Sequence, residues 1–279
     1  MAGVDGCCGP VVVVKLGGSV LSNESAYRRA AEFLCRRLAA APAERIVAVV
    51  SAQEGCTDTL ERAALDIVPA AAARALHLLW STGEIRSVAL LALHLQALGV
   101  KSAPLNVHET GLRVDTAPDG GASLGPGRLH ASLAACRIVI VPGFLGTDFH
   151  GSIVALGRGG SDLTAVLLAT GLGAARCELV KDVPGYFTAD PHRHATARHL
   201  ASLTFEDALA LADRGCDLVQ RRAIEAAAAA RLPLVVRSMN ESARISTVSD
   251  AVSDAILPGD ATPELAAAGF GGEDRVAAF

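Results

Sequence analysis

The stretch "VVVVKLGGS" (residues 11–19) joins an apolar run to a lysine, two glycines and a serine. Four consecutive valines predict a strand that is buried on both faces, as in a parallel sheet covered by helices. Glycines directly after a strand let the backbone approach a ligand closely, and their amides can face phosphate oxygens beside the Lys15 ammonium. The alternative is a turn with only a structural role. The residues at the other strand ends distinguish this turn from a phosphate-binding loop.

Similar apolar runs recur along the chain and alternate with helical patterns. We expect strands at 11–16, 45–51, 102–106, 137–143, 177–182 and 233–238. We expect helices at 24–41, 70–98, 161–172, 204–214 and 221–231. This order predicts an α/β sandwich with a mostly parallel sheet. We also expect a loop at 116–127 that could act as a mobile lid, and a weakly ordered tail or closing segment after residue 240.

Composition restricts the class of protein. Of 279 residues, 51% are hydrophobic and 19% are charged, which excludes a disordered chain. The net charge of −4 argues against nonspecific binding to nucleic acid. Seven scattered cysteines predict reduced thiols in a cytoplasmic protein rather than a disulfide framework. The start of the chain does not resemble a signal peptide, and the apolar segment 87–98 is too short to span a bilayer, so we expect no membrane association.

Ligands of open parallel sheets bind at the carboxyl ends of the strands, so the residues after each predicted strand are candidates. Ser51, Thr57 and Asp58 follow the second strand, where capping of the next helix explains Thr57 or Asp58 equally well. Residues 158–162 (RGGSD) follow the fourth strand and open an apolar helix. A glycine-rich turn, an arginine and a helix N-terminus coincide there, which favours an anion-binding function over a simple cap.

The fifth strand ends in Lys181 and Asp182. The chain has only three lysines, at positions 15, 101 and 181, and two of them stand at predicted strand ends. An ammonium at residue 181 could meet the same phosphates as Lys15, and a surface ion pair is the alternative. The histidines at 192, 194 and 199 indicate a solvated loop rather than a metal site, and we assign no residue as a metal ligand.

Five motifs in order, KLGGS (15–19), STGE (81–84), VPGFLG (141–146), LGRGGSD (156–162) and KDVPGYFTADP (181–191), resemble the amino acid kinase superfamily. The catalytic domain of aspartate kinases is the most similar. The resemblance covers about residues 10–240 and implies a three-layer αβα sandwich. It implies a catalytic domain at 1–240, with an acceptor-binding N-terminal part and an ATP-binding part at about 140–240. Residues 241–279 would form a C-terminal segment too short for the usual regulatory ACT domains.

Carried over by position, the resemblance implies a role for each motif residue. Lys15 would contact the transferred phosphoryl group, and Asp162 would lie at the reaction centre. The residues implied to bind the acceptor are Ser51, Thr57, Glu84 (its ammonium), Phe144, Arg158 (its α-carboxylate) and Ser161. The residues implied to bind the nucleotide are Gly17, Gly18, Ser19, Gly159, Gly160, Asp182, Phe187 and Asp190.

The chain also departs from the aspartate kinase pattern. Lys181 stands where a threonine is usual, Phe187 where a tyrosine is usual, and His192 where an arginine is usual. The usual run FGAKVLHP is RGCDLVQR (214–221), so that Asp217 replaces a lysine that contacts ATP. We predict that Lys15 and Lys181 together bracket the transferred phosphoryl group and that Asp162 holds both in place, which makes all three catalytic.

The function expected is ATP-dependent phosphorylation of an amino-acid carboxylate, with L-aspartate giving 4-phospho-L-aspartate. A carboxylate acceptor is ionised at neutral pH and needs no general base, so cations, Mg²⁺ and backbone amides have to offset the charge of the transfer. Two alternatives stay open: a kinase for another acceptor (glutamate, N-acetylglutamate or a pathway-specific acid), and a nucleotide-binding sensor without turnover. ATP and Mg²⁺ are the expected cofactors, and a homodimer is expected from the resemblance.

Overall fold

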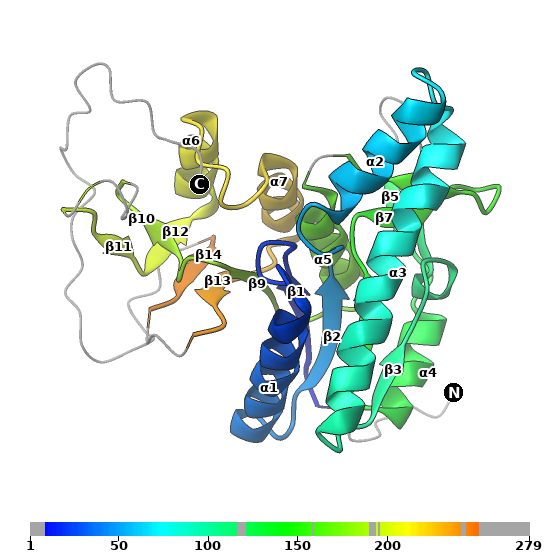
Figure 1. Ribbon diagram of the computed structural model, residues 1–279. Coiled ribbons are helices and arrows are strands. Elements are labelled where there is room, and N and C mark those ends of the chain that lie inside the picture. Colours follow the sequence, from blue (N-terminus) through cyan, green and yellow to red (C-terminus); the bar gives the residue numbers. More distant parts are fainter. Residues whose placement is uncertain are drawn as a thin grey trace, which may run out of the picture.

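The computed structural model describes residues 9–115, 121–157, 159–189, 194, 196–240 and 244–250. A central sheet runs through the molecule, and helices lie on both of its faces (Figure 1). The predicted strands and helices are present, and the largest difference in bounds is in the helix expected at 70–98, which spans Ala73–Ala97.

Eight strands form the main sheet. In spatial order they are β12 (Ser202–Thr204), β14 (Ser246–Ser249), β13 (Leu234–Ser238), β9 (Arg176–Lys181), β1 (Val11–Leu16), β2 (Arg45–Val50), β6 (Ile138–Pro142) and β3 (Ser102–Pro104). Neighbouring strands are parallel except for the antiparallel pair β13–β14. The mostly parallel sheet predicted from the β-branched runs is therefore confirmed.

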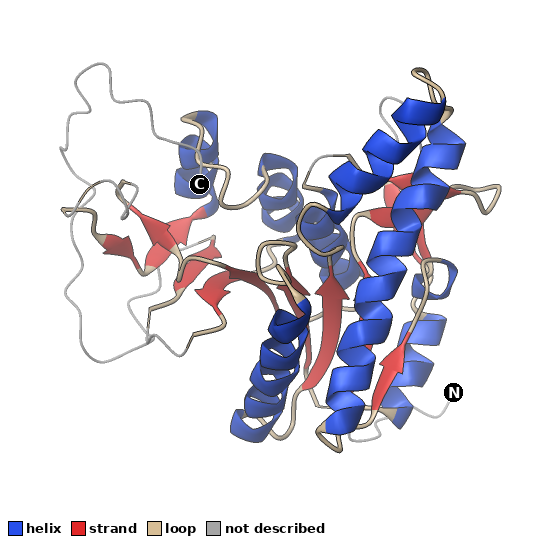
Figure 2. Cartoon of the chain, in the orientation of Figure 1, coloured by secondary structure: helices blue, strands red, loops and turns tan. Residues whose placement is uncertain are grey.

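Helices cover the two faces of this sheet, giving three layers (Figure 2). Alternate residues of β1 show the division, because Val12 and Val14 pack with α1 (Glu24–Ala40) and α3 (Ala73–Ala97). Val13 belongs to the other core, which is shared by α4 (Gly127–Ala135), α5 (Gly160–Gly171), α6 (Phe205–Asp213) and α7 (Arg221–Ala230). The three-layer αβα sandwich is confirmed, and β1, β2, β6 and β9 are buried on both faces as their apolar runs predicted.

Several short elements were not predicted. They are α2 (Cys56–Ile67), which packs on α3, the 3₁₀ turn η1 (His108–Thr110), a sheet of β5 (Ala122–Leu124), β4 (Leu112–Val114), β7 (Leu145–Thr147) and β8 (Ile153–Ala155), and a ribbon of β10 (Tyr186–Phe187) and β11 (His199–Leu200). The lid prediction for 116–127 was partly wrong, because β5 and the start of α4 occupy its second half, whereas 116–120 lie outside the described residues. The sheet also continues past residue 240 through β14.

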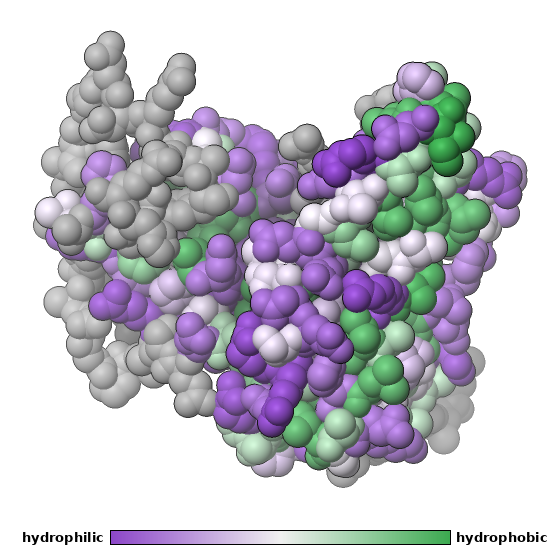
Figure 3. Space-filling model, in the orientation of Figure 1, coloured by the Kyte–Doolittle hydropathy of each residue, from purple (hydrophilic) through white to green (hydrophobic). Residues whose placement is uncertain are grey.

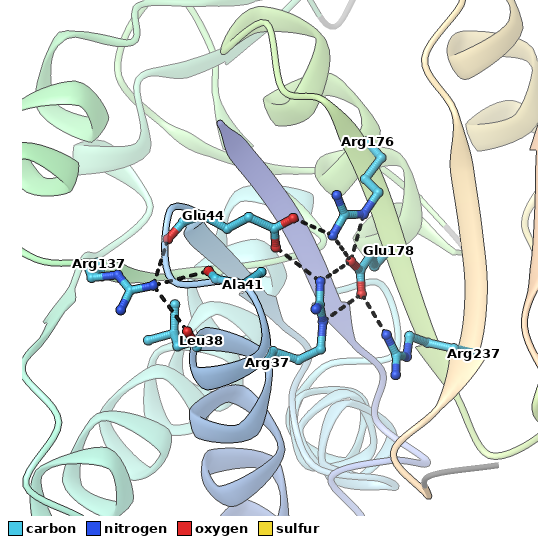
Figure 4. A network of polar contacts seen from close by, with 8 residues as sticks. All are labelled: Arg37, Leu38, Ala41, Glu44, Arg137, Arg176, Glu178 and Arg237. Atoms are coloured by element: carbon cyan, nitrogen blue, oxygen red, sulfur yellow. Dashed lines mark hydrogen bonds and ion pairs between the residues drawn. The ribbon is translucent and has the colours of Figure 1, made fainter. Parts of the chain in front are cut away.

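A buried acid joins several elements near the end of the sheet where β1 begins (Figure 4). Glu178 of β9 is 1% exposed and forms ion pairs with Arg37 of α1 at 2.5 Å, with Arg176 of β9 at 2.7 Å and with Arg237 of β13 at 3.4 Å. Glu44, in the turn before β2, also pairs with Arg37 and Arg176. Burial opposes ionisation of Glu178, but the arginines outweigh it and lower the pKa of this carboxyl.

Exposed apolar side chains gather along α2 and α3, where Figure 3 shows hydrophobic surface. Leu78 and Leu93 of α3 are more than half exposed, and a groove of about 620 Å³ lies between α3 and the edge strand β3. Within the part of the chain that the structure describes, no helix combines the length and the hydropathy needed to cross a bilayer.

Candidate active site

A cavity of about 360 Å³ lies where the chain leaves the carboxyl ends of β1, β2 and β6. Parallel strands that end at one edge of a sheet bring distant parts of the sequence together there. The predicted residues that line this cavity are Lys15, Gly18, Ser19, Ser51, Thr57, Glu84, Phe144, Gly159, Gly160, Ser161 and Asp162. The groove between α3 and β3 is larger, but it contains none of the predicted site residues.

Asp162, in the first turn of α5, binds two lysines from neighbouring strands. Its Oδ1 lies 2.9 Å from the Lys15 Nζ and its Oδ2 lies 2.8 Å from the Lys181 Nζ. The two ammonium groups come together because β1 and β9 are adjacent and parallel, with Leu16 opposite Val180. Asp162 is 3% exposed and Lys15 is 7% exposed. The cluster carries a net charge of +1, which suits an anionic ligand.

The electrostatics of this cluster are coupled. Burial opposes ionisation of Asp162, but the charges of Lys15 and Lys181 outweigh it and lower the pKa of the carboxyl. Burial lowers the pKa of Lys181, and Asp162 offsets part of that effect whereas the like charge of Lys15 adds to it. The cluster is therefore a carboxylate between two ammonium groups that are close to one another and partly desolvated.

Two glycine turns bring backbone to the wall of the cavity. A Cβ on Gly18 would lie 3.0 Å from the Ala52 carbonyl oxygen, so only glycine fits easily there. Gly159 precedes α5 with a φ of 68°, and a Cβ on it would collide with the Gln220 side chain. The cavity is therefore lined by the N-terminus of α5, where backbone amides and the helix dipole favour an anion.

Glu84 faces the cavity from α3, and 3% of its surface is exposed. Its carboxyl accepts a hydrogen bond from the Ala52 N–H, and its Oε2 has no hydrogen-bond partner among the described residues. Burial raises the pKa of Glu84 to about 8, although the Ala52 hydrogen bond and the Lys15 charge act against this. A buried carboxyl with an open oxygen provides a place for a cationic group.

Phe144 contributes an aromatic wall from an unusual backbone conformation. Its φ is 65°, in the left-handed region that costs a non-glycine residue about 1–3 kcal/mol. The Leu156 N–H donates to the Phe144 carbonyl at 2.9 Å and holds this turn. The Ser161 side chain lies next to this turn, since a Cβ built on the preceding residue, Gly143, would be 2.9 Å from it. Strain at a cavity wall is typical of functional sites.

Ser51 and Thr57 line the cavity from the end of β2 and from α2. The capping alternative for Thr57 or Asp58 was wrong, because α2 begins after Gly55, which has no side-chain cap. Thr57 is the second residue of that helix. Its hydroxyl is thus not needed to start the helix.

Other predicted residues lie apart from the cavity. Gly17 contacts the Lys15 side chain, since a Cβ there would be 3.1 Å from its Nζ. Asp182 follows β9, and Phe187 in β10 meets His199 in an edge-to-face contact with 5.3 Å between ring centroids. Arg158 and Asp190 lie outside the described residues, as does His192.

Sequence reasoning missed some residues of the cavity wall. They are Ala52, Gln53, Glu54, Gly55 and Gln220, whereas Asp58 was considered without being given a role and Asp217 was noted only as a departure. The loop after β2 could have been found by extending the strand-end argument beyond Ser51. Gln220 carries no local signal, because it reaches the site only through the packing of α7 beside the glycine turn before α5. The described residues contain no group of three or more His, Cys, Asp or Glu side chains that could hold a metal ion.

Comparisons with known proteins identify relatives of this chain. Residues 10–238 match the model of the amino acid kinase family. An aspartokinase of Mycobacterium tuberculosis is 38% identical over 234 residues, which is 82% of this chain and 54% of that protein. An aspartokinase of Geobacillus stearothermophilus is 35% identical over 87% of this chain and 60% of that protein. The chain therefore spans little more than half the length of these curated relatives.

Solved structures give the same fold. The aspartate kinase from Synechocystis superposes with a TM-score of 0.72 at 30% identity, covering 88% of this chain and 40% of that chain. A uridylate kinase from Archaeoglobus fulgidus has a TM-score of 0.62 at 18% identity and is covered over 99% of its length. The second likeness concerns the fold alone, because its sequence identity is low.

Proposed function

Since the chain belongs to the amino acid kinase family, we propose that it transfers the γ-phosphoryl group of ATP to the side-chain carboxylate of an amino acid. The acceptor we propose is L-aspartate, which would give 4-phospho-L-aspartate. Relatives at 35–38% identity that are named aspartokinases support this choice.

One observation carries the proposal: a single cavity is lined both by a group suited to an ammonium and by groups suited to a phosphate. Glu84 supplies the first, with its buried and partly unpaired carboxyl. Lys15, Asp162 and the N-terminus of α5 supply the second, and Lys181 reaches the same carboxylate. A protein that only sensed a nucleotide would have no use for the first group.

In the proposed mechanism the protein provides position and charge rather than proton transfer. The acceptor carboxylate is ionised at neutral pH, so the difficulty is to bring it against an anionic phosphate. The Lys15 and Lys181 ammonium groups would lie on the transferred phosphoryl oxygens, and Asp162 would keep the two lysines from separating. Preorganised donors of this kind are typically worth about 3–4 kcal/mol each in the transition state.

The nucleotide would lie toward Asp182 and Phe187, with the glycine turns at 17–19 and 159–160 near its phosphates. The N-terminal part of a catalytic domain at 1–240 would bind the acceptor, and about residues 140–240 would bind the nucleotide. The acceptor site would be shaped by Ser51, Thr57, Phe144 and Ser161. Arg158 would hold the α-carboxylate of the acceptor, and Asp190 would bind the nucleotide. Support for this division comes from the split lining of the cavity by both halves of the chain.

Mg²⁺ fits this site only when it is bound to the phosphates of the nucleotide. The described residues form no metal cage, and both oxygens of Asp162 already bind ammonium groups. Mg²⁺ is usually held by phosphates with one or two carboxylates, and the exposed carboxylates of the cavity wall are Glu54, Asp58 and Asp217. The ion would be held mainly by the phosphates and would neutralise part of their charge.

We further propose that the protein works as a homodimer in the cytoplasm. The five described cysteines are free thiols, which suits a reducing compartment. The exposed apolar side chains on α3 are the kind of surface that association buries. Sedimentation of the purified chain would report the oligomeric state.

The proposal is tested by trapping the acyl phosphate. The purified chain would be incubated with ATP, Mg²⁺ and hydroxylamine, with L-aspartate, L-glutamate or N-acetylglutamate as acceptor. We expect a hydroxamate and matching ADP release with L-aspartate, and neither product when ATP is left out. A hydroxamate only with another acid would replace the acceptor, and no hydroxamate with any acid would reject the activity.

A further inference from the structure

Three aromatic rings form a row between α3 and the cavity. The Trp80 ring centroid lies 5.7 Å from that of Phe144 and 5.6 Å from that of His77. His77 is tied to the backbone of Ile153 in β8 by a hydrogen bond. Only Phe144 of the three lines the cavity, so Trp80 stands directly behind the cavity wall.

Two elements border the Phe144 ring. The first is α5, since a Cβ on Gly160 would be 3.0 Å from the Phe144 Cδ2 and 3.4 Å from its Cα. The second is α3, whose Trp80 ring centroid lies 5.7 Å from that of Phe144. The Phe144 carbonyl accepts a hydrogen bond from the Leu156 N–H, which holds the main chain at this residue. Helix α5 presents the backbone of Gly160 to the ring, whereas α3 presents the side chain of Trp80, so a substitution at Trp80 can change the ring position.

Trp80 acts through packing rather than through a hydrogen bond. Its Nε1 is buried and has no hydrogen-bond partner among the residues that are described. Ring centroids 4.5–7 Å apart are the range in which aromatic pairs attract one another. A phenylalanine at position 80 would therefore keep most of the effect, whereas an aliphatic side chain would not.

Trp80 and Glu84 lie one helical turn apart on α3, so their side chains project from the same face of the helix. Helix α3 thus carries both the proposed partner of the acceptor's ammonium and the support of the aromatic wall. Two parts of the proposed acceptor site, Glu84 and the support of the Phe144 ring, therefore belong to one helix. A change at Trp80 alters the distance between the wall and Glu84 without touching the Lys15–Asp162–Lys181 cluster.

We propose that Trp80 is a positioning residue that holds the Phe144 ring against the acceptor and so sets the size of acid that the cavity takes. This inference rests on the proposed acceptor site, but not on the identity of the acceptor. It predicts that replacing Trp80 with an aliphatic side chain weakens binding of the acceptor and leaves binding of the nucleotide unchanged.

Kinetics of Trp80→Phe and Trp80→Leu test this role, with L-aspartate as the probe. We expect Trp80→Leu to raise KM for L-aspartate about tenfold, equivalent to about 1.4 kcal/mol, and to lower the preference for L-aspartate over the longer L-glutamate. We expect KM for ATP to change less than twofold, and Trp80→Phe to stay within about threefold of the wild type. Equal losses in both variants, or parallel rises for ATP and L-aspartate, would overturn the proposal.

Fluorescence separates this proposal from the proposed function, because Trp80 is the only tryptophan of the chain. We expect Phe144→Leu to shift the emission maximum of Trp80 and to increase its quenching by acrylamide in the protein without ligands. Unchanged emission and quenching would overturn the proposal even if L-aspartate is phosphorylated. If L-aspartate is not phosphorylated, the proposed function fails, and the Phe144→Leu result still decides whether Trp80 supports the wall.

Discussion

Two buried carboxylates of this protein, Asp162 and Glu178, are both held by cations but have different surroundings. Asp162 binds two lysines and lines a cavity at the carboxyl ends of the strands. Glu178 binds three arginines at the other end of the sheet, and it is not part of that cavity (Figure 4). Lysine is a compact charge that can turn toward a ligand, whereas arginine makes fixed, forked contacts.

The difference indicates two uses of the same electrostatic arrangement. The arginines around Glu178 connect α1, β9 and β13, so this cluster joins elements of the fold. The lysines around Asp162 leave a net positive charge beside an open cavity, so this cluster is prepared for an anion. We therefore expect changes at the first cluster to reduce stability and changes at the second to reduce catalysis.

The largest effect is expected from Lys15→Met. Removing an ammonium that acts on the transferred phosphoryl group should lower kcat by about a thousandfold, or about 4 kcal/mol. Lys101→Met is the matched control, because Lys101 is the remaining lysine of the chain and is exposed far from the cavity. A Lys15→Met enzyme with more than a tenth of the wild-type kcat would show that the cluster is not catalytic.

Glu178→Gln should act on stability instead. Breaking a buried ion pair by removing one partner costs about 3–5 kcal/mol, because the arginines are left uncompensated. We expect urea unfolding to show a loss of this size, with kcat per folded molecule within about twofold of the wild type. The control is Glu109→Gln, which removes an exposed pair with Arg128 and should cost under about 1 kcal/mol. Equal losses in the two variants would contradict a structural role for Glu178.

The pKa of Glu84 predicts a pH effect on the acceptor. With a pKa of about 8, Glu84 is mainly protonated at neutral pH in the empty cavity, whereas an ammonium requires its charged form. KM for L-aspartate should thus rise as the pH falls below 8, by up to about tenfold per unit. Because folding favours the protonated form, stability contributed at this residue should be lost as the pH rises through 8.

Glu84→Gln is the control for this pH effect, since it keeps the shape and removes the titration. We expect it to raise KM for L-aspartate and to flatten its dependence on pH between 6 and 8. The same slope in wild type and Glu84→Gln would mean that another group titrates.

A smaller effect is expected from Asp217→Lys. Asp217 is an exposed carboxylate on the cavity wall, so its replacement changes a repulsion with the ATP phosphates into an attraction. Exposed charges contribute up to about 1 kcal/mol, which predicts a fall of a few-fold in KM for ATP. Asp58→Lys makes the same charge change at a residue of the wall on α2 and should leave KM for ATP unaltered. A rise in KM for ATP in Asp217→Lys would instead support Asp217 as the residue that meets Mg²⁺.

The long elements of the fold were predictable because their patterns are long. Strands such as β1 and β2 contain four or five consecutive apolar residues, and α1 and α3 are extended helices. The three-residue strands β4, β5, β7 and β8 are too short to show a period, and they exist only through pairing with one another. Strand β14 joins the sheet in the same way, after the sequence pattern has faded.

The lysine cluster was predictable because topology alone determines it. Lys15 and Lys181 end adjacent parallel strands, and Asp162 opens a helix at the same edge. The contact between Trp80 and Phe144 was not predictable, because the two rings meet only through tertiary packing. The capping role considered for Thr57 was wrong for a related reason. A residue type that often caps helices can lie inside a helix, and here the helix begins after Gly55, which has a φ of 72°.

Lys181→Met, measured for kcat and for unfolding free energy in the same preparation, tests the central claim most directly. Without Lys181, Asp162 keeps Lys15 as a partner and the repulsion between the two ammonium groups disappears. We therefore predict a fall in kcat of at least about a hundredfold, with the unfolding free energy within about 1 kcal/mol of the wild type. Near-normal kcat with a loss of stability would contradict this account, since it would make the Asp162 cluster structural like that of Glu178.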